Sequence, residues 1–352
     1  MLSFLQILDT ALARSASDIF VVPGKAVSCK AGRNLSCISE SAIMPDQSER
    51  IIAEAYGIAG RDMERLVSSG DDDFCISVPG KVRLRVSAYK QRGSLAAVIR
   101  IISFGIPDYR MLGIPERVMA VAGQHKGLTL ITGSAGSGKS TTLACIIDRI
   151  NHTRDGHIIT LEDPVEYLHR HDRCIISQRE IQIDTKDYVT ALRASLRQSP
   201  DVILLGEMRD HETISTAMTA AETGHLVFST LHTLGAANTV DRIIDCFPPV
   251  GQQQIRVQLA MVLNSVISQQ LIPTQDGALV PVFEILHATP AVRNLIRESR
   301  VHQLDALVSA AGDAEMVAMD DAILELFREG RISRETALQY ALRPEALQRR
   351  LK

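Results

Sequence analysis

The chain has 352 residues, of which 45% are hydrophobic and 22% are charged, which is ordinary for a soluble globular protein. A chain of this length is expected to form two domains with ample hydrophobic core for each. The formal net charge of -3 gives no electrostatic case for a nucleic-acid-binding protein.

Cysteine usage and the hydrophobic segments narrow the class of protein further. The six cysteines include no Cys-x-x-Cys pair, which argues against a zinc site or a disulfide framework and suits a reducing cytosol. The N-terminus lacks a basic segment followed by an apolar core, so we predict no signal peptide. The longest uncharged stretch, residues 257–275, is broken by polar side chains, and the apolar residues around it share one helical face. We therefore predict a packing helix there and no transmembrane segment.

Residues 1–105 have the pattern of a small α/β domain. Apolar side chains at helical spacing predict helices, and alternating or β-branched runs predict strands. The run from Asp71 to Asp73 is predicted to be a solvated acidic turn without a ligand role. The predicted helices lie at residues 2–12 and 46–68, and the predicted strands lie at residues 16–22, 82–88 and 95–102.

Arginine side chains project from this predicted sheet. Arg83 and Arg85 alternate with apolar residues along one strand and so share its polar face, and Arg100 lies on the next strand. Two interpretations stay open. The arginines form an ordinary solvated sheet face, or one or two of them reach the triphosphate of a neighbouring subunit as arginine fingers.

A segment punctuated by Pro and Gly, residues 106–116, is predicted to link the first domain to a second one, residues 117–352. In the second domain strands alternate with helices, which implies a parallel sheet whose ligands bind at the carboxyl ends of the strands. The predicted strands lie at residues 157–162, 201–206 and 225–230, and the predicted helices at residues 186–198, 211–223 and 235–246.

The second domain opens with a phosphate-binding loop. Residues 133–140 fit the pattern Gly, four residues, Gly-Lys-Ser/Thr, between a predicted buried strand, 128–132, and a predicted helix, 141–150. The loop N–H groups and the helix N-terminus attract phosphate, Lys139 reaches the β/γ-phosphates, and the Ser140 hydroxyl can ligate Mg²⁺. The predicted nucleotide-binding residues of the loop are Gly133, Ser134, Gly136, Ser137, Gly138, Lys139 and Ser140.

Acidic residues follow two of the predicted strands. Glu162 and Asp163 end the first, where they could hold Mg²⁺ or activate the attacking water. The second strand ends in the manner of a Walker B motif, but Gly206 occupies the place where an aspartate usually stands. Glu207 then serves instead, holding Mg²⁺ through water or orienting the nucleophile. The neighbouring Arg209 and Asp210 are predicted either to pair with each other or to act.

His225 and His232 bracket the predicted strand at residues 225–230. Two histidines at the ends of a strand beside the Walker B motif favour sensing of the γ-phosphate. Metal ligation is not expected, because no cysteine or third histidine stands at a ligand-like spacing.

The order of these motifs resembles that of the type II/IV secretion ATPases, and most closely the PilT family, the retraction motors of type IV pili. The resemblance rests on the P-loop, on residues 162–166 (Glu-Asp-Pro-Val-Glu), and on residues 204–210 and 225–233. Residues 291–298 (Ala-Val-Arg-Asn-Leu-Ile-Arg-Glu) resemble the C-terminal signature of that family, and residues 16–18 and 79–86 match its N-terminal domain.

The resemblance implies a PAS-like N-terminal domain and a RecA-like ATPase domain with C-terminal helices. It implies a homohexameric ring that hydrolyses ATP with Mg²⁺ and drives pilus retraction, without nucleic acid. It places that ring in the bacterial cytoplasm, at the inner face of the inner membrane, against the platform protein at the pilus base. The functional residues it implies are Thr141 as a further nucleotide contact, Glu162 as the catalytic glutamate, Glu207 as the Walker B acid and Mg²⁺ ligand, His225 and His232 as the histidine box, and Arg85 and Arg100 as contacts across the subunit interface.

Some positions depart from the family pattern, notably Phe20 in place of a histidine and Ser229 in place of a glycine. Such departures leave room for a specialised paralogue. Other functions also stay open: a pilus-assembly or type II secretion ATPase of the same superfamily, a DNA-dependent RecA-like enzyme, and a nucleotide-binding regulator that does not hydrolyse.

Overall fold

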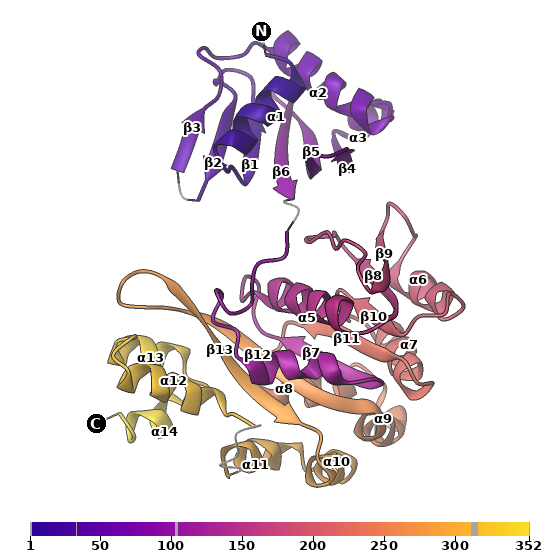
Figure 1. The fold of residues 1–352 in the computed structure, drawn as a ribbon, viewed down its shortest axis with the longest axis vertical. Helices are drawn as coiled ribbons and strands as arrows, with labels where there is room; N and C mark the ends of the chain where they lie inside the picture. The colour runs from indigo at the N-terminus through magenta and orange to yellow at the C-terminus, as the bar shows by residue number, and fades with distance from the viewer. Residues whose placement is uncertain (1, 33, 103–104, 311–315, 352) are drawn as a thin grey trace. The chain divides into compact units, whose positions relative to one another are not determined.

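The computed structural model of the protein describes residues 2–32, 34–102, 105–310 and 316–351 (Figure 1). The chain divides into two compact units, Met1–Gly105 and Ile106–Lys352, each with its own sheet. Both units combine helices with strands, so the predicted α/β class is confirmed. Among the described residues, no helix combines the length and the apolar character that crossing a membrane requires.

The N-terminal unit is a six-stranded antiparallel sheet in the order β3-β2-β1-β6-β5-β4. Side chains along β5 are alternately buried and more exposed, and the buried face packs against the helices. The strands are β1 (Asp18–Val21), β2 (Ser28–Ala31), β3 (Asn34–Cys37), β4 (Asp71–Val78), β5 (Val82–Gln91) and β6 (Ser94–Ile102). The helices are α1 (Phe4–Ala13), α2 (Pro45–Ala59) and α3 (Glu64–Ser69).

The helix predicted at residues 46–68 is interrupted. Gly60 ends α2 in the left-handed conformation, at a φ of 65°, and α3 begins four residues later. A left-handed glycine after the last helical residue is a common stop, because glycine has no Cβ to resist that conformation.

The acidic run at residues 71–73 is not a solvated turn, so that prediction is wrong. The run begins β4, and the alternation of the strand buries the middle residue, Asp72, which is 2% exposed. Its carboxylate accepts a hydrogen bond from the Tyr56 hydroxyl at 2.9 Å and forms ion pairs with Arg61 and Arg65. Burial and this hydrogen bond raise the pKa of Tyr56. The acidic residue therefore ties α2 and the loop after it to the sheet.

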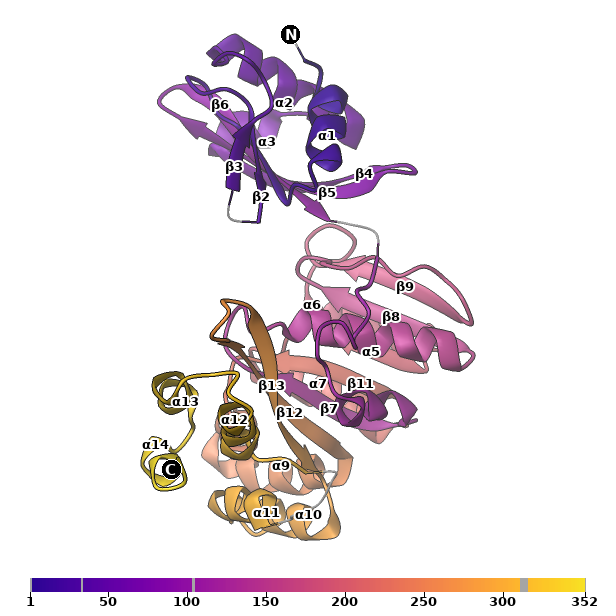
Figure 2. The ribbon, with the colours of Figure 1, turned by 60° about the vertical axis from the view of Figure 1, so that its left-hand side comes forward.

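The C-terminal unit contains a seven-stranded sheet in the order β13-β12-β7-β11-β10-β8-β9 (Figure 2). Every neighbouring pair is parallel except β12 and β13, which form an antiparallel hairpin at one edge. The predicted parallel sheet is thus present and is extended by this hairpin. The strands are β7 (Gly127–Thr132), β8 (Gly156–Glu162), β9 (Cys174–Glu180), β10 (Val202–Leu205), β11 (Leu226–Leu231), β12 (Leu263–Pro273) and β13 (Leu279–His287).

Helices cover both faces of this sheet, and for that reason its central strands are buried on both sides. One hydrophobic core lies under α5 and the segment before β7, and a second lies under α6 to α9. The helices of the sheet region are α4 (Glu116–Met119), η1 (Ala120–Gly123), α5 (Lys139–Thr153), α6 (Tyr188–Ser195), α7 (His211–Glu222), α8 (Ala236–Asp245) and α9 (Pro249–Val262). The C-terminal helices are α10 (Pro290–Arg297), η2 (Val301–Gln303), α11 (Leu304–Ala310), α12 (Met319–Arg328), α13 (Arg334–Tyr340) and α14 (Pro344–Gln348).

The predicted packing helix over residues 257–275 is only half right. Helix α9 ends at Val262, and β12 begins at the next residue and pairs with both β7 and β13. A strand that is buried on both faces has a continuous apolar pattern, and periodicity alone does not distinguish that pattern from a buried helix. The prediction therefore missed β12, a strand that lies directly beside β7.

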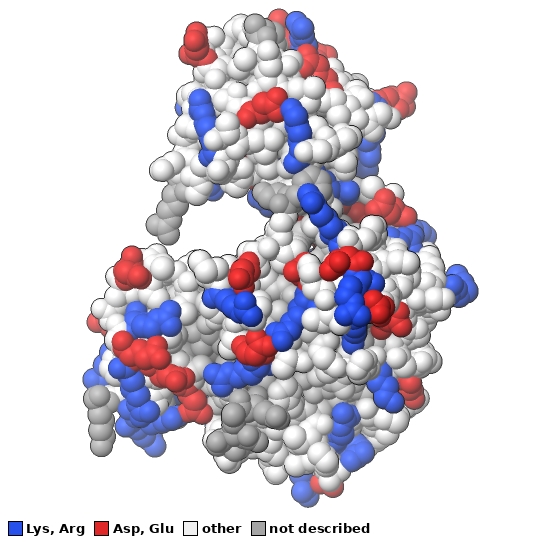
Figure 3. Space-filling view, viewed as in Figure 1, with Lys and Arg blue, Asp and Glu red and all other residues white. Residues whose placement is uncertain are grey.

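Charged side chains of both signs are interspersed on one face of the protein (Figure 3). On the face drawn in Figure 3, Lys and Arg side chains stand next to Asp and Glu side chains in each unit. This face gives no support to the alternative of a DNA-dependent enzyme, which would use a basic stripe.

The buried carboxylate of Asp72 generates a stability prediction. Asp72→Ala leaves the buried Tyr56 hydroxyl without its acceptor, so we expect the N-terminal unit to lose about 2 kcal/mol of unfolding free energy. The exposed neighbour Asp73 is the matched control, and its replacement by Ala should change stability by less than about 0.5 kcal/mol. Hydrogen exchange of peptides from residues 1–105 in increasing urea measures both. Equal protection in the two variants would contradict the assignment.

Candidate active site

The predicted P-loop joins β7 to α5. The loop leaves β7 after Thr132, and α5 begins at Lys139 with Gly138 as its N-cap. Gly133 and Gly138 have φ angles of 145° and 87°, in a region that other residues rarely adopt. The loop therefore brings its backbone N–H groups and a helix N-terminus to one place, as phosphate binding requires.

Lys139 is folded onto the loop itself. Its side chain is 8% exposed, and Nζ donates hydrogen bonds of 2.9 Å to the carbonyl oxygens of Gly133 and Ser134. Burial lowers the pKa of Lys139, while the charges of Glu207 and Glu166 oppose that shift. The ammonium group is held at the phosphate-binding loop by acceptors that phosphate oxygens can replace.

A cavity of about 270 Å³ opens beside the loop, at the carboxyl edge of the sheet. Residues that follow β7, β8, β10 and β11 meet there, although they are far apart in the sequence. The predicted site residues that line the cavity are Gly136, Lys139, Ser140, Glu162, Asp163, Glu207 and His232. The other lining residues, to which the sequence assigned no role in binding or catalysis, are Ala135, Pro164, Glu166, Tyr188, Gly206 and Thr230, and all of them except Tyr188 lie within the sequence motifs.

Glu162 is the last residue of β8 and is half-buried. Its Oε1 accepts hydrogen bonds from the Thr160 hydroxyl at 2.6 Å and from Nε2 of Gln178 at 3.4 Å. Burial raises the pKa of Glu162 to about 7, and the nearby Glu166 charge acts in the same direction. A carboxylate with this pKa can accept a proton from water near neutral pH.

Glu207 follows β10 and has a different environment. Its Oε1 forms an ion pair with Arg209 at 2.6 Å, and its Oε2 lies 3.3 Å from Nε2 of His232. Oε2 is buried and accepts no hydrogen bond from the described residues. Arg209 thus pairs with Glu207 and not with Asp210, which instead caps α7 by accepting a hydrogen bond from the Thr213 N–H.

Packing explains why a glycine precedes Glu207. A Cβ atom on Gly206 would lie 2.9 Å from the Tyr188 hydroxyl and 3.2 Å from the carbonyl oxygen of Leu161. Burial and the charges of Asp163 and Glu207 raise the pKa of Tyr188, which keeps its phenol neutral. Tyr188 occupies the space in which an acidic side chain at position 206 would stand. No local sequence pattern marks Tyr188 for this place, because it comes from α6.

His225 does not line this cavity, so of the two predicted histidines the structure brings only His232 to it. His225 precedes β11, and His232 follows it. At about 3.3 Å per residue, the six residues of β11 separate the two by ~20 Å. Nδ1 of His225 lies 2.9 Å from the carbonyl oxygen of Ala220 instead. Two histidines that bracket a parallel strand lie at its opposite ends, and only the one at the carboxyl end reaches the ligand-binding edge of the sheet.

Arg85 and Arg100 belong to the N-terminal unit and are directly opposite each other on β5 and β6. Arg100 is 66% exposed, and its Nε forms an ion pair of 3.0 Å with Oδ1 of Asp18. The two arginines form a basic pair on the more exposed face of that sheet.

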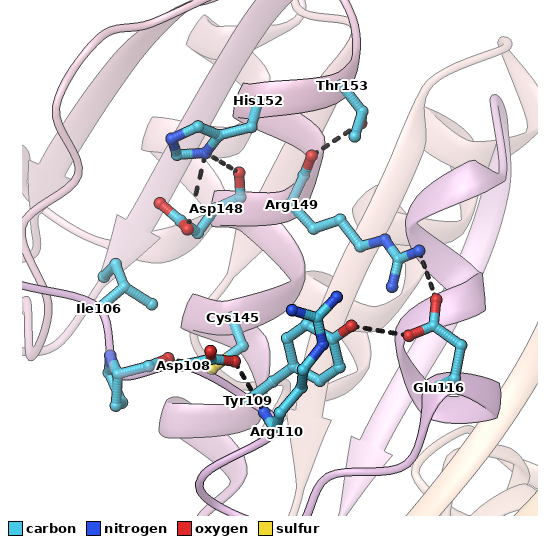
Figure 4. A pocket seen from close by; sticks show the side chains of 11 residues that line it. Ile106, Asp108, Tyr109, Arg110, Glu116, Cys145, Asp148, Arg149, His152 and Thr153 are labelled. Carbon is cyan, nitrogen blue, oxygen red and sulfur yellow. Dashed lines mark hydrogen bonds and ion pairs between the residues drawn. The ribbon is translucent and has the colours of Figure 1, made fainter.

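A second, larger cavity of about 610 Å³ lies between residues 106–116 and α5 (Figure 4). Several of its charged groups are already paired. Arg149 forms an ion pair with Glu116, which also accepts a hydrogen bond from the Tyr109 hydroxyl at 2.8 Å. None of the predicted nucleotide-binding or catalytic residues lines it. The cavity at the P-loop is therefore the candidate nucleotide site.

Comparison with known proteins agrees with this geometry. Residues 2–303 match the family model described as "Type II/IV secretion system protein". The chain is 40% identical to the type IV pilus retraction ATPase PilT of Pseudomonas aeruginosa, over 97% of this chain and 98% of that protein. It is 45% identical to a twitching motility protein of Neisseria gonorrhoeae, over 86% of this chain and 82% of that protein.

Solved structures give the same relationship. The chain superimposes on the pilus retraction motor PilT with bound ADP at a TM-score of 0.92 and 40% identity, covering 99% of this chain and all of that one. The ATPase DotB of Legionella pneumophila matches at a TM-score of 0.81 and 27% identity, over 96% of this chain and 95% of that one. The chain therefore belongs to the type II/IV secretion system protein family and, within it, to the PilT family of ATPases.

Proposed function

We propose that this protein is a motor that hydrolyses ATP and drives the retraction of type IV pili. The observation that supports the ATPase chemistry is the convergence of Lys139, Glu162, Glu207 and His232 on one cavity beside the P-loop. The printed functions of the pilus relatives, which match over nearly the whole chain, support retraction as the work that is done.

The loop residues bind the phosphates. The N–H groups between Gly133 and Ser140 face the β-phosphate region, Thr141 extends this contact, and the ammonium of Lys139 exchanges its loop carbonyls for phosphate oxygens. Ser140 and Glu207 would hold Mg²⁺, a role that fits the buried Oε2 of Glu207, because that oxygen accepts no hydrogen bond from the described residues. Mg²⁺ neutralises charge on the phosphates and orients them.

Glu162 is assigned as the proton acceptor for the attacking water, because its pKa of about 7 matches that task. His232 and Glu207 also line the cavity, within 3.3 Å of each other, where they would orient the γ-phosphate. The alternative is that the two glutamates exchange these roles, in which case Glu207→Gln alone would abolish hydrolysis and Glu162→Gln would not.

A ring of identical subunits would supply the charge that the cavity lacks. Of the described residues that line the cavity, Lys139 is the only Lys or Arg. Phosphoryl transfer is accelerated by a further cation on the γ-phosphate, and neighbouring subunits often provide it. We assign that role to Arg85 and Arg100, which lie directly opposite each other on β5 and β6 and so present two positive charges together, one of them also paired with Asp18. We propose a homohexamer with these arginines acting on the neighbouring nucleotide.

The place of action follows from the same proposal. A pilus retraction motor works on the cytoplasmic side of the inner membrane, against the platform protein at the base of the pilus. The similarity to a pilus retraction ATPase and to a twitching motility protein supports this location and this partner.

The function is tested by hydrolysis and by retraction together. Lys139→Ala should abolish Mg²⁺-dependent ATP hydrolysis, and Glu162→Gln should bind ATP but lower kcat by about 10²–10⁴-fold.

In a twitching-deficient strain that lacks its own retraction ATPase, the unaltered chain should restore retraction and Lys139→Ala should not. Restored pilus assembly without retraction would point to an assembly ATPase, and a folded chain without hydrolysis would point to a regulator.

The pH dependence of hydrolysis tests the role of Glu162. The proton acceptor must be ionised, and the pKa of Glu162 is raised to about 7. With saturating Mg²⁺, kcat/KM for ATP should therefore rise as the pH increases from about 6 to 8, with a midpoint near the pKa. The affinity for ADP, which needs no proton acceptor, is the control and should not follow this step. A flat kcat/KM over this range would exclude Glu162 as the base.

Mixed rings test the contribution of the arginines. A ring that combines Arg100→Ala subunits with Lys139→Ala subunits contains some interfaces with an intact P-loop and an intact neighbouring arginine. Partial recovery of hydrolysis on mixing two inactive variants is the expected result, and the same applies to Arg85→Ala. No recovery in mixed rings of confirmed stoichiometry would confine Arg100 to its structural pairing with Asp18.

A further inference from the structure

Strand β12 carries three consecutive buried polar side chains. Ser268, Gln269 and Gln270 are 0%, 2% and 9% exposed, between the apolar residues Ile267 and Leu271. Burying a polar side chain is costly unless it makes hydrogen bonds. We therefore expect each of the three side chains to have a hydrogen-bond partner. Strand β12 pairs directly with the P-loop strand β7.

The three side chains contact three different parts of the unit. Ser268 accepts a hydrogen bond of 2.9 Å from the N–H of Gly235, in the loop that follows β11. Gln270 donates through Nε2 to the carbonyl oxygen of Tyr340, at the end of α13, at 3.0 Å. Gln269, between them, faces the P-loop.

Gln269 touches the P-loop at both of its ends. Its backbone carbonyl oxygen lies so close to Gly133 that a Cβ there would approach it to 2.2 Å. Its side-chain Nε2 lies over Gly138, where a Cβ would approach it to 2.9 Å. Its Oε1 accepts a hydrogen bond of 2.8 Å from the Thr142 hydroxyl, in the first turn of α5. Thr142 is 0% exposed, so this bond is shielded from water.

These contacts constrain the loop where it binds phosphate. The N–H groups that face the phosphates lie between Gly133 and the first turn of α5, and their directions depend on the path of the loop. Gln269 fixes the start of the P-loop through its backbone carbonyl and the end of the loop through its side chain. Neither contact involves the nucleotide, because Gln269 lies behind the loop and does not line the cavity.

We propose that Gln269 is a positioning residue that holds the P-loop in its phosphate-binding shape. The amide does so through Oε1 on Thr142 and Nε2 on Gly138, and the inference rests on the nucleotide site proposed above. Loss of the amide should therefore weaken nucleotide binding without removing any group that touches the nucleotide.

The neighbouring Gln270 supplies a matched control. It is the same residue type on the same strand and is also buried, but its amide bonds to the carbonyl oxygen of Tyr340 and not to the P-loop. Gln269→Met and Gln270→Met each replace one buried amide by an apolar side chain of similar length. If Gln269 served only to stabilise the fold, the two variants would change nucleotide binding to the same extent.

The experiment measures Mg-ADP binding by calorimetry on the full chain. Gln269→Met should weaken Mg-ADP binding by about tenfold, which corresponds to about 1.4 kcal/mol, and Gln270→Met by less than about twofold. Under turnover, Gln269→Met should raise KM for ATP while kcat stays within about threefold, the pattern expected when binding common to ground and transition states is lost. Equal affinities in the two variants would overturn the proposal.

Thr142→Val provides a second, independent variant if Gln269→Met does not fold. It keeps the volume of the side chain and removes only the hydroxyl that donates to Gln269. It should weaken Mg-ADP binding as Gln269→Met does, and the double variant should be no weaker than the weaker single one, because the two changes break the same bond. Unchanged Mg-ADP affinity in Thr142→Val, or additive losses in the double variant, would overturn the proposal.

Failure of this inference and failure of the proposed function are distinguishable. If the unaltered chain does not bind Mg-ADP, the nucleotide site itself is wrong. If it binds Mg-ADP and Gln269→Met binds equally well, only the positioning role is wrong. Neither result depends on hydrolysis or on pilus retraction.

Discussion

The active site depends on the parallel pairing of β7, β11, β10 and β8. In that register Leu231 is opposite Thr132, and Leu205 is opposite both Ser229 and Leu161, so these strands end at a common edge. The residues that follow these strands, between positions 133 and 232, meet at this edge although they are far apart in the sequence. The same constraint sends a residue that precedes a strand to the far edge, which is why His225 stands apart from the cavity.

The hairpin beside β7 connects this edge to the C-terminal helices. Glu284 on β13 is 5% exposed, and its carboxylate accepts hydrogen bonds from the N–H groups of Ala236 at 2.6 Å and Met319 at 3.4 Å. Burial raises the pKa of Glu284. The loop after β11 is thus held at one end by the approach of His232 to Glu207 and at the other by this carboxylate. If that loop shifted when phosphate binds or leaves, the hydrogen bond between Ala236 and Glu284 would be strained. The same carboxylate also accepts the hydrogen bond from Met319 at the start of α12.

The sequence was most informative where chemistry requires a fixed spacing. The P-loop and the acids at the strand ends could be placed because a parallel sheet brings every strand end to one edge. Tyr188 and Thr230 could not, since their places in the cavity depend on how α6 and β11 pack. Periodicity failed at β12, where burial on both faces imitates a helix. The prediction at Asp72 followed the charge of the acidic run and not the alternation of β4, and the Tyr56 hydroxyl that bonds to the buried carboxylate comes from a distant helix.

The environments of the two glutamates favour the proposed division of their roles. Glu162 is half-buried and accepts its hydrogen bonds from the neutral Thr160 and Gln178 side chains, and burial raises its pKa to about 7. Glu207 lies against the Arg209 guanidinium, and its buried Oε2, 3.3 Å from Nε2 of His232, accepts no hydrogen bond from the described residues. A carboxyl with a raised pKa suits proton transfer, and an ion-paired carboxylate with a free oxygen suits a cation or its water. Tyr188 maintains this division, because it fills the position from which an acid at residue 206 would add negative charge between the two.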